Sequence, residues 1–198
     1  MTDYILSIDP GLSTGIALIG YETDQAPTLV GAWQFSGGVV GLLNWVETHH
    51  RGSWYDDEWV DVTRNRKNVT IIAEKFTARN TRGFSYTTAS LEPLRCEGAL
   101  IALGLMPDYT PKEKRWMDPG VQYLVGGKDL AAKRSRQHGF LQDSGFYRTN
   151  RDFPDSPAKD KADDFRSAAA HGLAYLAREV GNKPAFSMIA DWVESHGG

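Results

Sequence analysis

The stretch "ILSIDPGLSTGIALIGY", residues 5–21, contains two apolar runs that are separated by a Pro-Gly turn. Apolar runs of this length are typical of buried strands, and the Pro-Gly pair is typical of the turn that joins them. Asp9 ends the first run, so the hairpin carries a carboxylate at the end of a buried strand. A charge in that position loses hydration and requires a compensating partner.

A second carboxylate, Glu74, ends the apolar run "VTIIA" in the same way. If the two strands are parallel neighbours, both carboxylates project from the end of the sheet where α/β proteins bind their ligands. The two charges repel each other unless a cation lies between them. Oxygen ligands without cysteine favour Mg²⁺ or Mn²⁺ over zinc. The alternative is that Asp9 only caps the turn and that Glu74 ends its strand in solvent.

A third acidic group lies in "SPAKDKADDFRSAAAH", which is predicted to be helical. Asp160 and Asp163 are three residues apart and share a helix face, and Asp164 is also one turn from Asp160. The apolar stripe that includes Ala170 continues back to Asp163, which favours Asp163 as the ligand, with Asp164 as its substitute. Acids in a first turn also stabilise the helix dipole, which is the alternative role for this group. Together, these carboxylates suffice for two metal ions that hydrolyse a phosphodiester.

The chain has 198 residues, a formal net charge of −3 and 41% hydrophobic residues, which fits one domain with a small appendage. We expect a domain over residues 1–180 and a short C-terminal helical tail over residues 181–198. The single cysteine, Cys96, excludes an internal disulfide and a cysteine-built zinc site. No apolar run is long enough to span a bilayer, and the N-terminus lacks a secretory signal pattern. The sequence therefore predicts a soluble, cytoplasmic protein.

The predicted elements follow the order β-β-β-α-β-α-β-α-α, which indicates an α/β fold. Its sheet is mixed and five-stranded, with three antiparallel strands followed by parallel strands, and helices flank it. Helical spacing of apolar residues predicts helices over residues 39–50, 89–105, 128–145, 161–180 and 185–195. Residues 51–68 and 76–88 are predicted to be an exposed loop and a mobile loop.

Basic residues are concentrated in a few stretches although the net charge is negative. They cluster at residues 64–67, 75–82 and 112–136. A weakly acidic chain with this distribution can present one basic face to nucleic acid. The alternative is that each cluster is an ordinary solvated surface.

Four stretches resemble the RuvC-type Holliday junction resolvases. "ILSIDPGLSTGIALI" is similar to their first hairpin, I-L-G-I-D-P-G-x-x-x-T-G-x-x-x-[IV], and "IIAEKFTARN" is similar to their second acidic strand. "AAKRSRQH" resembles their basic helix, and "DKADDFRSAAAH" resembles their D-x-x-D-A-L-A-x-A-x-x-H helix. The stretches occur in the family's order from Ile5 to about Leu176.

The resemblance implies an RNase H-like fold, a Mg²⁺-dependent (or Mn²⁺-dependent) endonuclease that cleaves branched DNA with two metal ions, and a homodimer. By position, it implies that Asp9, Glu74, Asp160 and Asp163 are catalytic metal ligands and that Lys133 lies near the scissile phosphate. The residues implied to contact DNA are Phe76, Arg79, Asn80, Arg82, Phe84, Lys112, Lys114, Arg134 and Arg136. The helix over residues 91–105 is the implied dimer interface, although its apolar face must also pack on the sheet.

The sequence departs from the family pattern in several places, and residues 51–68 and the tail after Gly181 have no counterpart in it. The loop after Glu74 is one residue shorter, so Phe84 or Tyr86 can replace Phe76 at the junction centre. Asp164 and Phe165 replace the small residues that follow the last aspartate, which leaves Asp163 and Asp164 as alternatives.

Other functions therefore stay open. A nuclease of the same fold can cut flaps or forks, and a non-catalytic DNA-binding module can share the fold. "IDPGLSTGIAL" also resembles the phosphate-binding hairpin of the actin and sugar-kinase superfamily, which are ATP-binding phosphotransferases. That superfamily needs two such lobes, and 198 residues hold one.

Overall fold

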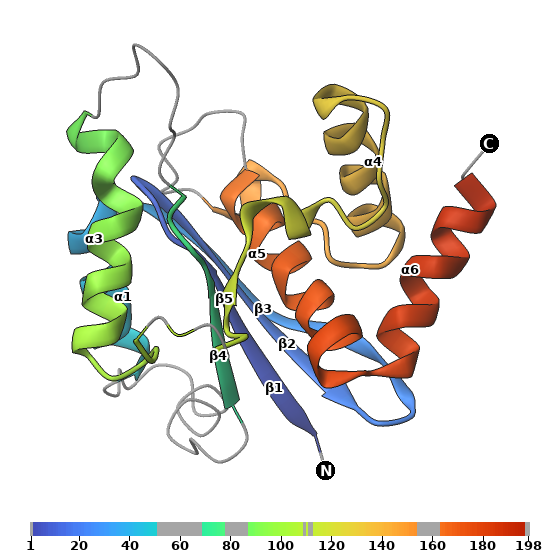
Figure 1. The fold of residues 1–198 in the computed structure, drawn as a ribbon, viewed down its shortest axis with the longest axis horizontal. Coiled ribbons are helices and arrows are strands. Elements are labelled where there is room, and N and C mark those ends of the chain that lie inside the picture. Colours follow the sequence, from blue (N-terminus) through green and yellow to red (C-terminus); the bar gives the residue numbers. More distant parts are fainter. Residues whose placement is uncertain are drawn as a thin grey trace.

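The computed structural model describes residues 2–50, 69–77, 87–108, 110, 113–153 and 163–196. They form a five-stranded sheet in the order β3-β2-β1-β4-β5 (Figure 1). The first three strands are antiparallel, whereas β4 pairs in parallel with β1 and β5 in parallel with β4. This arrangement confirms the predicted mixed five-stranded sheet, in which three antiparallel strands are followed by parallel strands. The strands are β1 (Asp3–Asp9), β2 (Ser13–Glu22), β3 (Gln25–Ser36), β4 (Val69–Glu74) and β5 (Trp116–Met117).

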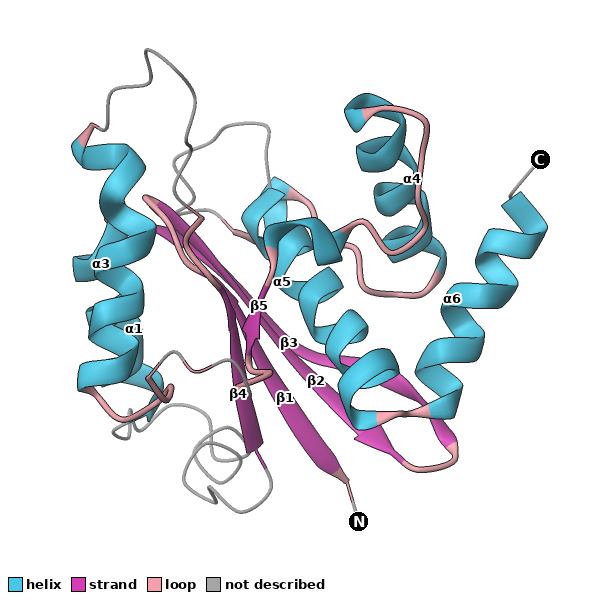
Figure 2. Ribbon diagram, in the orientation of Figure 1, coloured by secondary structure: helices cyan, strands magenta, loops and turns pink. Residues whose placement is uncertain are grey.

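Helices cover both faces of the sheet (Figure 2). One face carries α1 (Gly38–His50) and α3 (Thr88–Ala102), and the other carries α5 (Asp163–Tyr175), with α4 (Leu130–Asp143) and α6 (Lys183–His196) packed around it. Shorter turns are the 3₁₀ segments η1 (Pro119–Gln122) and η2 (Asn150–Asp152), and the π-helical segment η3 (Leu176–Val180) continues α5. Each predicted helix is present with small shifts in its ends. Within the described ranges, no helix combines the length and apolar character that a membrane span requires.

Side-chain alternation along β1 and β4 determines toward which face of the sheet each carboxylate points. Ile5 of β1 and Ile72 of β4 belong to the core beneath α5, and the residues that alternate with them belong to the core beneath α1 and α3. Alternate residues of a strand share a face, so Asp9 falls on the face of Ile5 and Glu74 on the face of Ile72. Both carboxylates are therefore directed to the side of the sheet that α5 covers.

Helix α5 lies unusually close to strand β2 because glycine occupies the contact on each element. A Cβ atom at Gly15 of β2 would lie 2.1 Å from the backbone carbonyl carbon of Asp164, and one at Gly172 of α5 would lie 2.5 Å from Ile19 Cδ1. Phe165 N also donates a hydrogen bond of 3.0 Å to the side-chain oxygen of Gln34 on β3. These contacts fix the N-terminal turn of α5 over the end of the hairpin.

The C-terminal residues expected to form a tail pack onto the same core. Ala185 of α6 is fully buried, and Trp192 meets Phe140 of α4 edge to face with ring centroids 5.9 Å apart. The indole N–H of Trp192 also donates a 2.7 Å hydrogen bond to Asp143 at the end of α4. Helix α6 thus braces α4 against α5.

Replacing Gly15 by alanine is expected to destabilise the protein. The added methyl group meets backbone rather than a flexible side chain, so the start of α5 must move, at a cost of about 1–3 kcal/mol or more. Gly98 is the matched control, because it is exposed in α3 and a Cβ there meets nothing within 4 Å. Gly98→Ala should stabilise by about 0.5–1 kcal/mol. Urea unfolding midpoints measure both, and equal midpoints for the two variants would argue against the close contact.

Candidate active site

Three carboxylates lie around the ends of β1 and β4. The parallel register of these strands runs up to the residues just before Asp9 and Glu74, and its next step places these two side by side. On its other side Asp9 pairs with Gly15, over which the backbone of Asp164 packs. Asp9 therefore lies between Glu74 on the neighbouring strand and Asp164 on the helix above.

The negative charges of these carboxylates repel one another. Burial raises the pKa of Asp9 well above its ordinary value, and the negative charges of Glu74 and Asp164 raise it further, against a smaller lowering by Ser167. Burial also raises the pKa of Asp164; the Ser13 hydroxyl lowers it, and the charges of Asp163 and Glu74 add to the increase. Such a site favours a bound proton or a cation.

His171 supports Glu74 from α5. Its Nε2 atom lies 2.7 Å from Glu74 Oε2, and because a carboxylate accepts, the Nε2–H group is the donor. The imidazole is fully buried. His171 follows Asp164 by seven residues, about two helical turns, so both lie on the α5 face toward the strands. From the sequence alone His171 has no assigned role, although its spacing from Asp164 is the signal that places both residues on one helix face.

The structure places Asp164, and not Asp163, beside Asp9 and Glu74, which differs from the sequence-based preference. The Asp163 side chain is 49% exposed, and its Oδ1 lies 3.3 Å from Arg166 Nη1 and 3.9 Å from His138 Nε2. The apolar stripe suggested that Asp163 was nearest the sheet. The close contact at Gly15 instead turns the face that carries Asp164 toward the strands.

Arg166 ties α5 to the segment that precedes it. Its Nη2 donates a 2.8 Å hydrogen bond to the Tyr147 hydroxyl, and its guanidinium lies 4.4 Å from the centroid of the Tyr147 ring. Burial lowers the pKa of His138, and the adjacent Arg166 lowers it further, against the opposing effect of Asp163. Asp163 therefore belongs to a network on the side of α5 that faces α4.

The basic residues of α4 have different surroundings. Arg134 lines a cavity beside Asp164, whereas Lys133 lies over the Tyr123 ring, 5.9 Å from its centroid. Arg136 donates to two backbone carbonyl oxygens, at 3.0 Å to Val125 and 2.8 Å to His196. The structure thus places Arg134 in a cavity that Asp164 also lines and gives Arg136 a contact with the end of α6.

The segment after Glu74 is held by α3. The backbone N–H of Phe76 donates to the carboxylate of Glu97, a residue that is almost completely buried in α3. Phe76 itself is half-buried. Glu97 thereby connects α3 to the residues that follow Glu74, and the sequence alone did not single it out. The predicted residues Arg79, Asn80, Arg82, Phe84, Lys112 and Asp160 lie outside the described residues.

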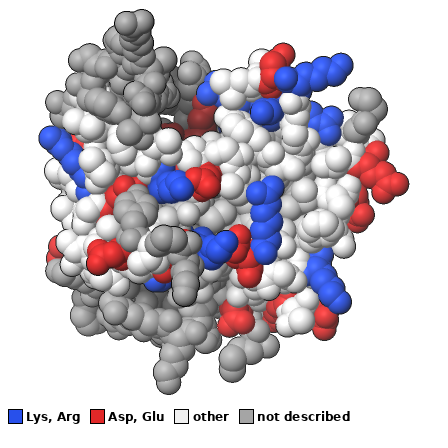
Figure 3. Space-filling view, in the orientation of Figure 1, with Lys and Arg blue, Asp and Glu red and all other residues white. Residues whose placement is uncertain are grey.

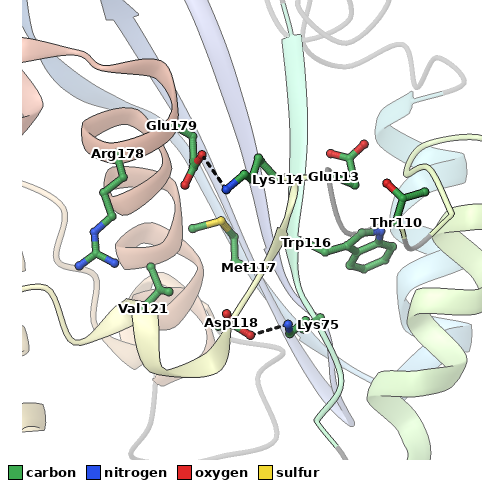
Figure 4. Close-up of a pocket in the computed structure, with 10 residues that line it drawn as sticks. All are labelled: Lys75, Thr110, Glu113, Lys114, Trp116, Met117, Asp118, Val121, Arg178 and Glu179. Carbon is green, nitrogen blue, oxygen red and sulfur yellow. Dashed lines mark ion pairs between the residues drawn. The ribbon is translucent and has the colours of Figure 1, made fainter.

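A second cavity lies between β5 and the end of α5, and the predicted DNA contact Lys114 lines it (Figure 4). Two of its cations pair with carboxylates in the same cavity. Lys114 lies 3.7 Å from Glu179, and Lys75 lies 2.5 Å from Asp118. This pairing reduces the charge that the cavity can offer to a phosphate.

The site is acidic at its floor and basic at one wall. In the space-filling view, Lys and Arg side chains lie over the end of the molecule that carries α4, with acidic atoms in a recess beside it (Figure 3). Among the described residues, no three His, Cys, Asp or Glu side chains can hold a metal ion in the positions that they occupy. Hard carboxylate oxygens are nevertheless the donors that Mg²⁺ and Mn²⁺ prefer. A metal site here needs rotation of these side chains or a ligand from residues 154–162.

No protein-family model and no curated protein sequence matches this chain. Among solved structures, a Thermus thermophilus RuvC structure is similar, with 15% identity and a TM-score of 0.48, covering 92% of this chain and 98% of that one. T. thermophilus RuvC in complex with Holliday junction substrate is similar at 12% identity and a TM-score of 0.47, covering 91% and 97%.

Replacing Asp9 by asparagine is expected to stabilise the metal-free protein at alkaline pH. Because its pKa is raised in the folded state, the wild type loses stability as the pH rises from the ordinary carboxyl range through that raised pKa. Asp9→Asn removes this loss, so its advantage in EDTA should be greater at pH 8 than at pH 4. Thermal unfolding measures the difference.

The same experiment tests for a cation. Adding Mg²⁺ at pH 8 should raise the unfolding temperature of the wild type more than that of Asp9→Asn, because a ligand of the folded state stabilises it. An equal increase in both proteins would show that the ion binds elsewhere.

Proposed function

We propose that this protein is a divalent-metal-dependent endonuclease that cleaves branched DNA. The observation that supports the proposal most directly is the position of Asp9 between Glu74 and Asp164 at the strand ends, where burial and like charge raise its pKa. A cation that offsets this repulsion can also catalyse phosphodiester hydrolysis. The motifs that resemble RuvC-type resolvases lie on the same residues.

The carboxylates of Asp9, Glu74 and Asp164 would hold the metal ions, with Asp160 as a further proposed ligand. Bound Mg²⁺ or Mn²⁺ would activate water and stabilise the leaving oxygen of the phosphodiester. Two ligands sit on adjacent strands, which fixes their separation, and the third comes from α5. His171 holds Glu74 in one orientation through the 2.7 Å hydrogen bond. A ligand held in this way does not have to be ordered when substrate binds.

Basic side chains beside the carboxylates would position the DNA. Arg134 lies at the cavity wall next to Asp164, and Lys133 lies one residue before it on α4. Contacts of Lys and Arg with phosphate release counterions, so binding should weaken as salt rises. We propose four-way junctions as the substrate; forks and flaps are alternatives within the same chemistry.

We further propose a homodimer, because paired incisions in a two-fold symmetric junction require two active sites. The neighbouring helices α1 and α3 expose large apolar side chains on the face away from the sheet, namely Val40 (61%), Leu43 (40%) and Leu94 (48%). Most of the apolar stretch at the end of α3 packs inward, and Leu100 and Leu105 are buried. The exposed residues of both helices are therefore the better candidates for contact with a second copy.

The nuclease proposal predicts that the same substitution reduces cleavage strongly at Asp164 but only partly at the adjacent Asp163. Asp164→Asn should reduce Mg²⁺-dependent cleavage by more than the roughly 10- to 100-fold that follows changes to outer-shell groups. Asp163→Asn, which makes the same change outside the carboxylate group, should retain a substantial part of the activity. Cleavage rates on a four-way junction, with fork, flap and linear duplex of matched sequence, measure both effects. Absence of metal-dependent cleavage by the wild type on every substrate would refute the proposed function.

The dimer proposal is tested by sedimentation at micromolar concentration. Leu94→Glu should weaken self-association at least about tenfold, because a charge is costly to bury in an apolar interface. Leu130→Glu is the matched control, since Leu130 is 51% exposed on α4, away from α1 and α3. A wild type that is monomeric yet cleaves both strands of a junction would contradict the dimer.

A further inference from the structure

Two buried polar atoms between α5 and the sheet lack hydrogen-bond partners. Ser7 of β1 and His171 of α5 are both fully buried. Among the described residues, neither Ser7 Oγ nor His171 Nδ1 has a partner. Buried polar groups are nearly always paired, so these two atoms require an explanation.

The packing of α5 brings the two residues together. A Cβ atom at Gly172, the residue after His171, would lie 3.3 Å from Ser7 Cβ. Ser7 is in register with Ile72 of β4. Glu74, which accepts the hydrogen bond from His171, follows Ile72 by two residues and therefore shares its face. The imidazole thus extends from a part of α5 that lies over Ser7 to the neighbouring strand.

The hydrogen-bonding capacities of the two atoms are complementary. The Nε2–H group of His171 donates to Glu74 Oε2 at 2.7 Å, so Nδ1 of the neutral ring is an acceptor. A serine hydroxyl has one hydrogen to donate and can rotate it toward an acceptor. One hydrogen bond from Ser7 to His171 would therefore satisfy both unpaired atoms.

The serine at this position distinguishes this chain from the hairpin pattern that it resembles. The pattern I-L-G-I-D-P-G has glycine where this chain has Ser7. Strand β1 is paired on both sides here, with Ala17 and Ile72, so the strand itself has no need of a hydroxyl. Because an unpaired buried hydroxyl is costly, its presence favours a bond to the ring above it.

We propose that Ser7 is a positioning residue, whose hydroxyl donates to His171 Nδ1 and thereby holds the ring in the tautomer and orientation that present Nε2–H to Glu74. The inference rests on the proposed nuclease function and deepens it, because Glu74 is one of the proposed metal ligands. Hydrogen bonds just outside a metal's ligands are worth about 10- to 100-fold in affinity or activity. A bond one step further out should act at the lower end of this range.

NMR of the metal-free protein tests the hydrogen bond itself. With ¹⁵N-labelled histidine, His171 Nδ1 of the wild type should carry no proton and should show the shielding of a nitrogen that accepts a hydrogen bond. Ser7→Ala should remove this shielding. The matched control is Ser144→Ala, because the Ser144 hydroxyl donates at 2.6 Å to the carbonyl oxygen of Phe140 at the end of α4. Its loss should leave the His171 signal unchanged.

Cleavage tests the consequence of the bond. Ser7→Ala should lower the Mg²⁺-dependent kcat on a four-way junction about tenfold. It should leave the KM for the junction unchanged, because Ser7 is fully buried and cannot touch DNA. Ser144→Ala should cleave like the wild type. His171→Gln keeps a side-chain N–H donor but has no Nδ1, so in that background Ser7→Ala should have no further effect.

The possible failures are distinguishable. If the wild type cleaves no branched substrate, the proposed function fails together with the positioning role, and the NMR signal still decides the hydrogen bond. If it cleaves, but Nδ1 carries a proton or gives the same signal in Ser7→Ala, the inference is overturned and the nuclease stands. An unchanged kcat in Ser7→Ala, or an equal loss in the His171→Gln background, overturns it as well.

A second measurement covers the case in which Ser7→Ala does not fold. The wild-type spectrum then decides alone. A scalar coupling between the Ser7 hydroxyl proton and His171 Nδ1 supports the bond, and an unshielded Nδ1 overturns it.

Discussion

The arrangement of this site depends on the contact between α5 and β2 at Gly15. With no side chain there, the backbone of Asp164 can lie directly on the hairpin, and a Cβ atom would come within 2.1 Å of it. That approach sets both the height and the rotation of the helix over the sheet. Asp164 is thereby brought to Asp9 while His171, two turns later, reaches Glu74. The first hairpin and the late helix, far apart in the sequence, become two halves of one acidic site.

The acidic site is stabilised by the elements around it rather than by its own members. Like charges at the strand ends would push α5 away from the sheet, since Glu74 and Asp164 raise the pKa of Asp9 and Glu74 raises that of Asp164. Opposing this are the buried contacts of α5 further along its length, such as Gly172 against Ile19. Glu97 of α3 holds the backbone after Glu74 from the opposite face of the sheet. The fold thus keeps the carboxylates together although their charges repel, an arrangement that a bound proton or a cation stabilises.

Much of this was predictable from the sequence, and the exceptions have physical causes. Asp9 and Glu74 could be placed because a strand has a period of two and because an acid at the end of a buried apolar run is costly unless a partner compensates its charge. The sequence favoured Asp163, whereas Asp164 lies beside Asp9, because adjacent helical residues point about 100° apart and the rotation of a helix depends on its tertiary contacts. The position of α6 shows the same limit of sequence-based prediction. It depends on the hydrogen bond from Trp192 to Asp143 at the end of α4, which periodicity does not predict. Periodicity identifies elements, whereas the contacts between them orient the side chains.

The paired aspartates at the start of α5 show what this orientation achieves. Asp164 faces the strands and joins the acidic group, whereas Asp163 faces α4 and joins Arg166 and His138. One helical turn therefore forms a wall shared by the carboxylate site and the cavity that Arg134 lines. Any shift of α5 relative to β2 therefore moves its side of the carboxylate site and its side of the cavity together. The glycine contact that assembles the acidic site therefore also fixes the position of this cavity relative to the carboxylates.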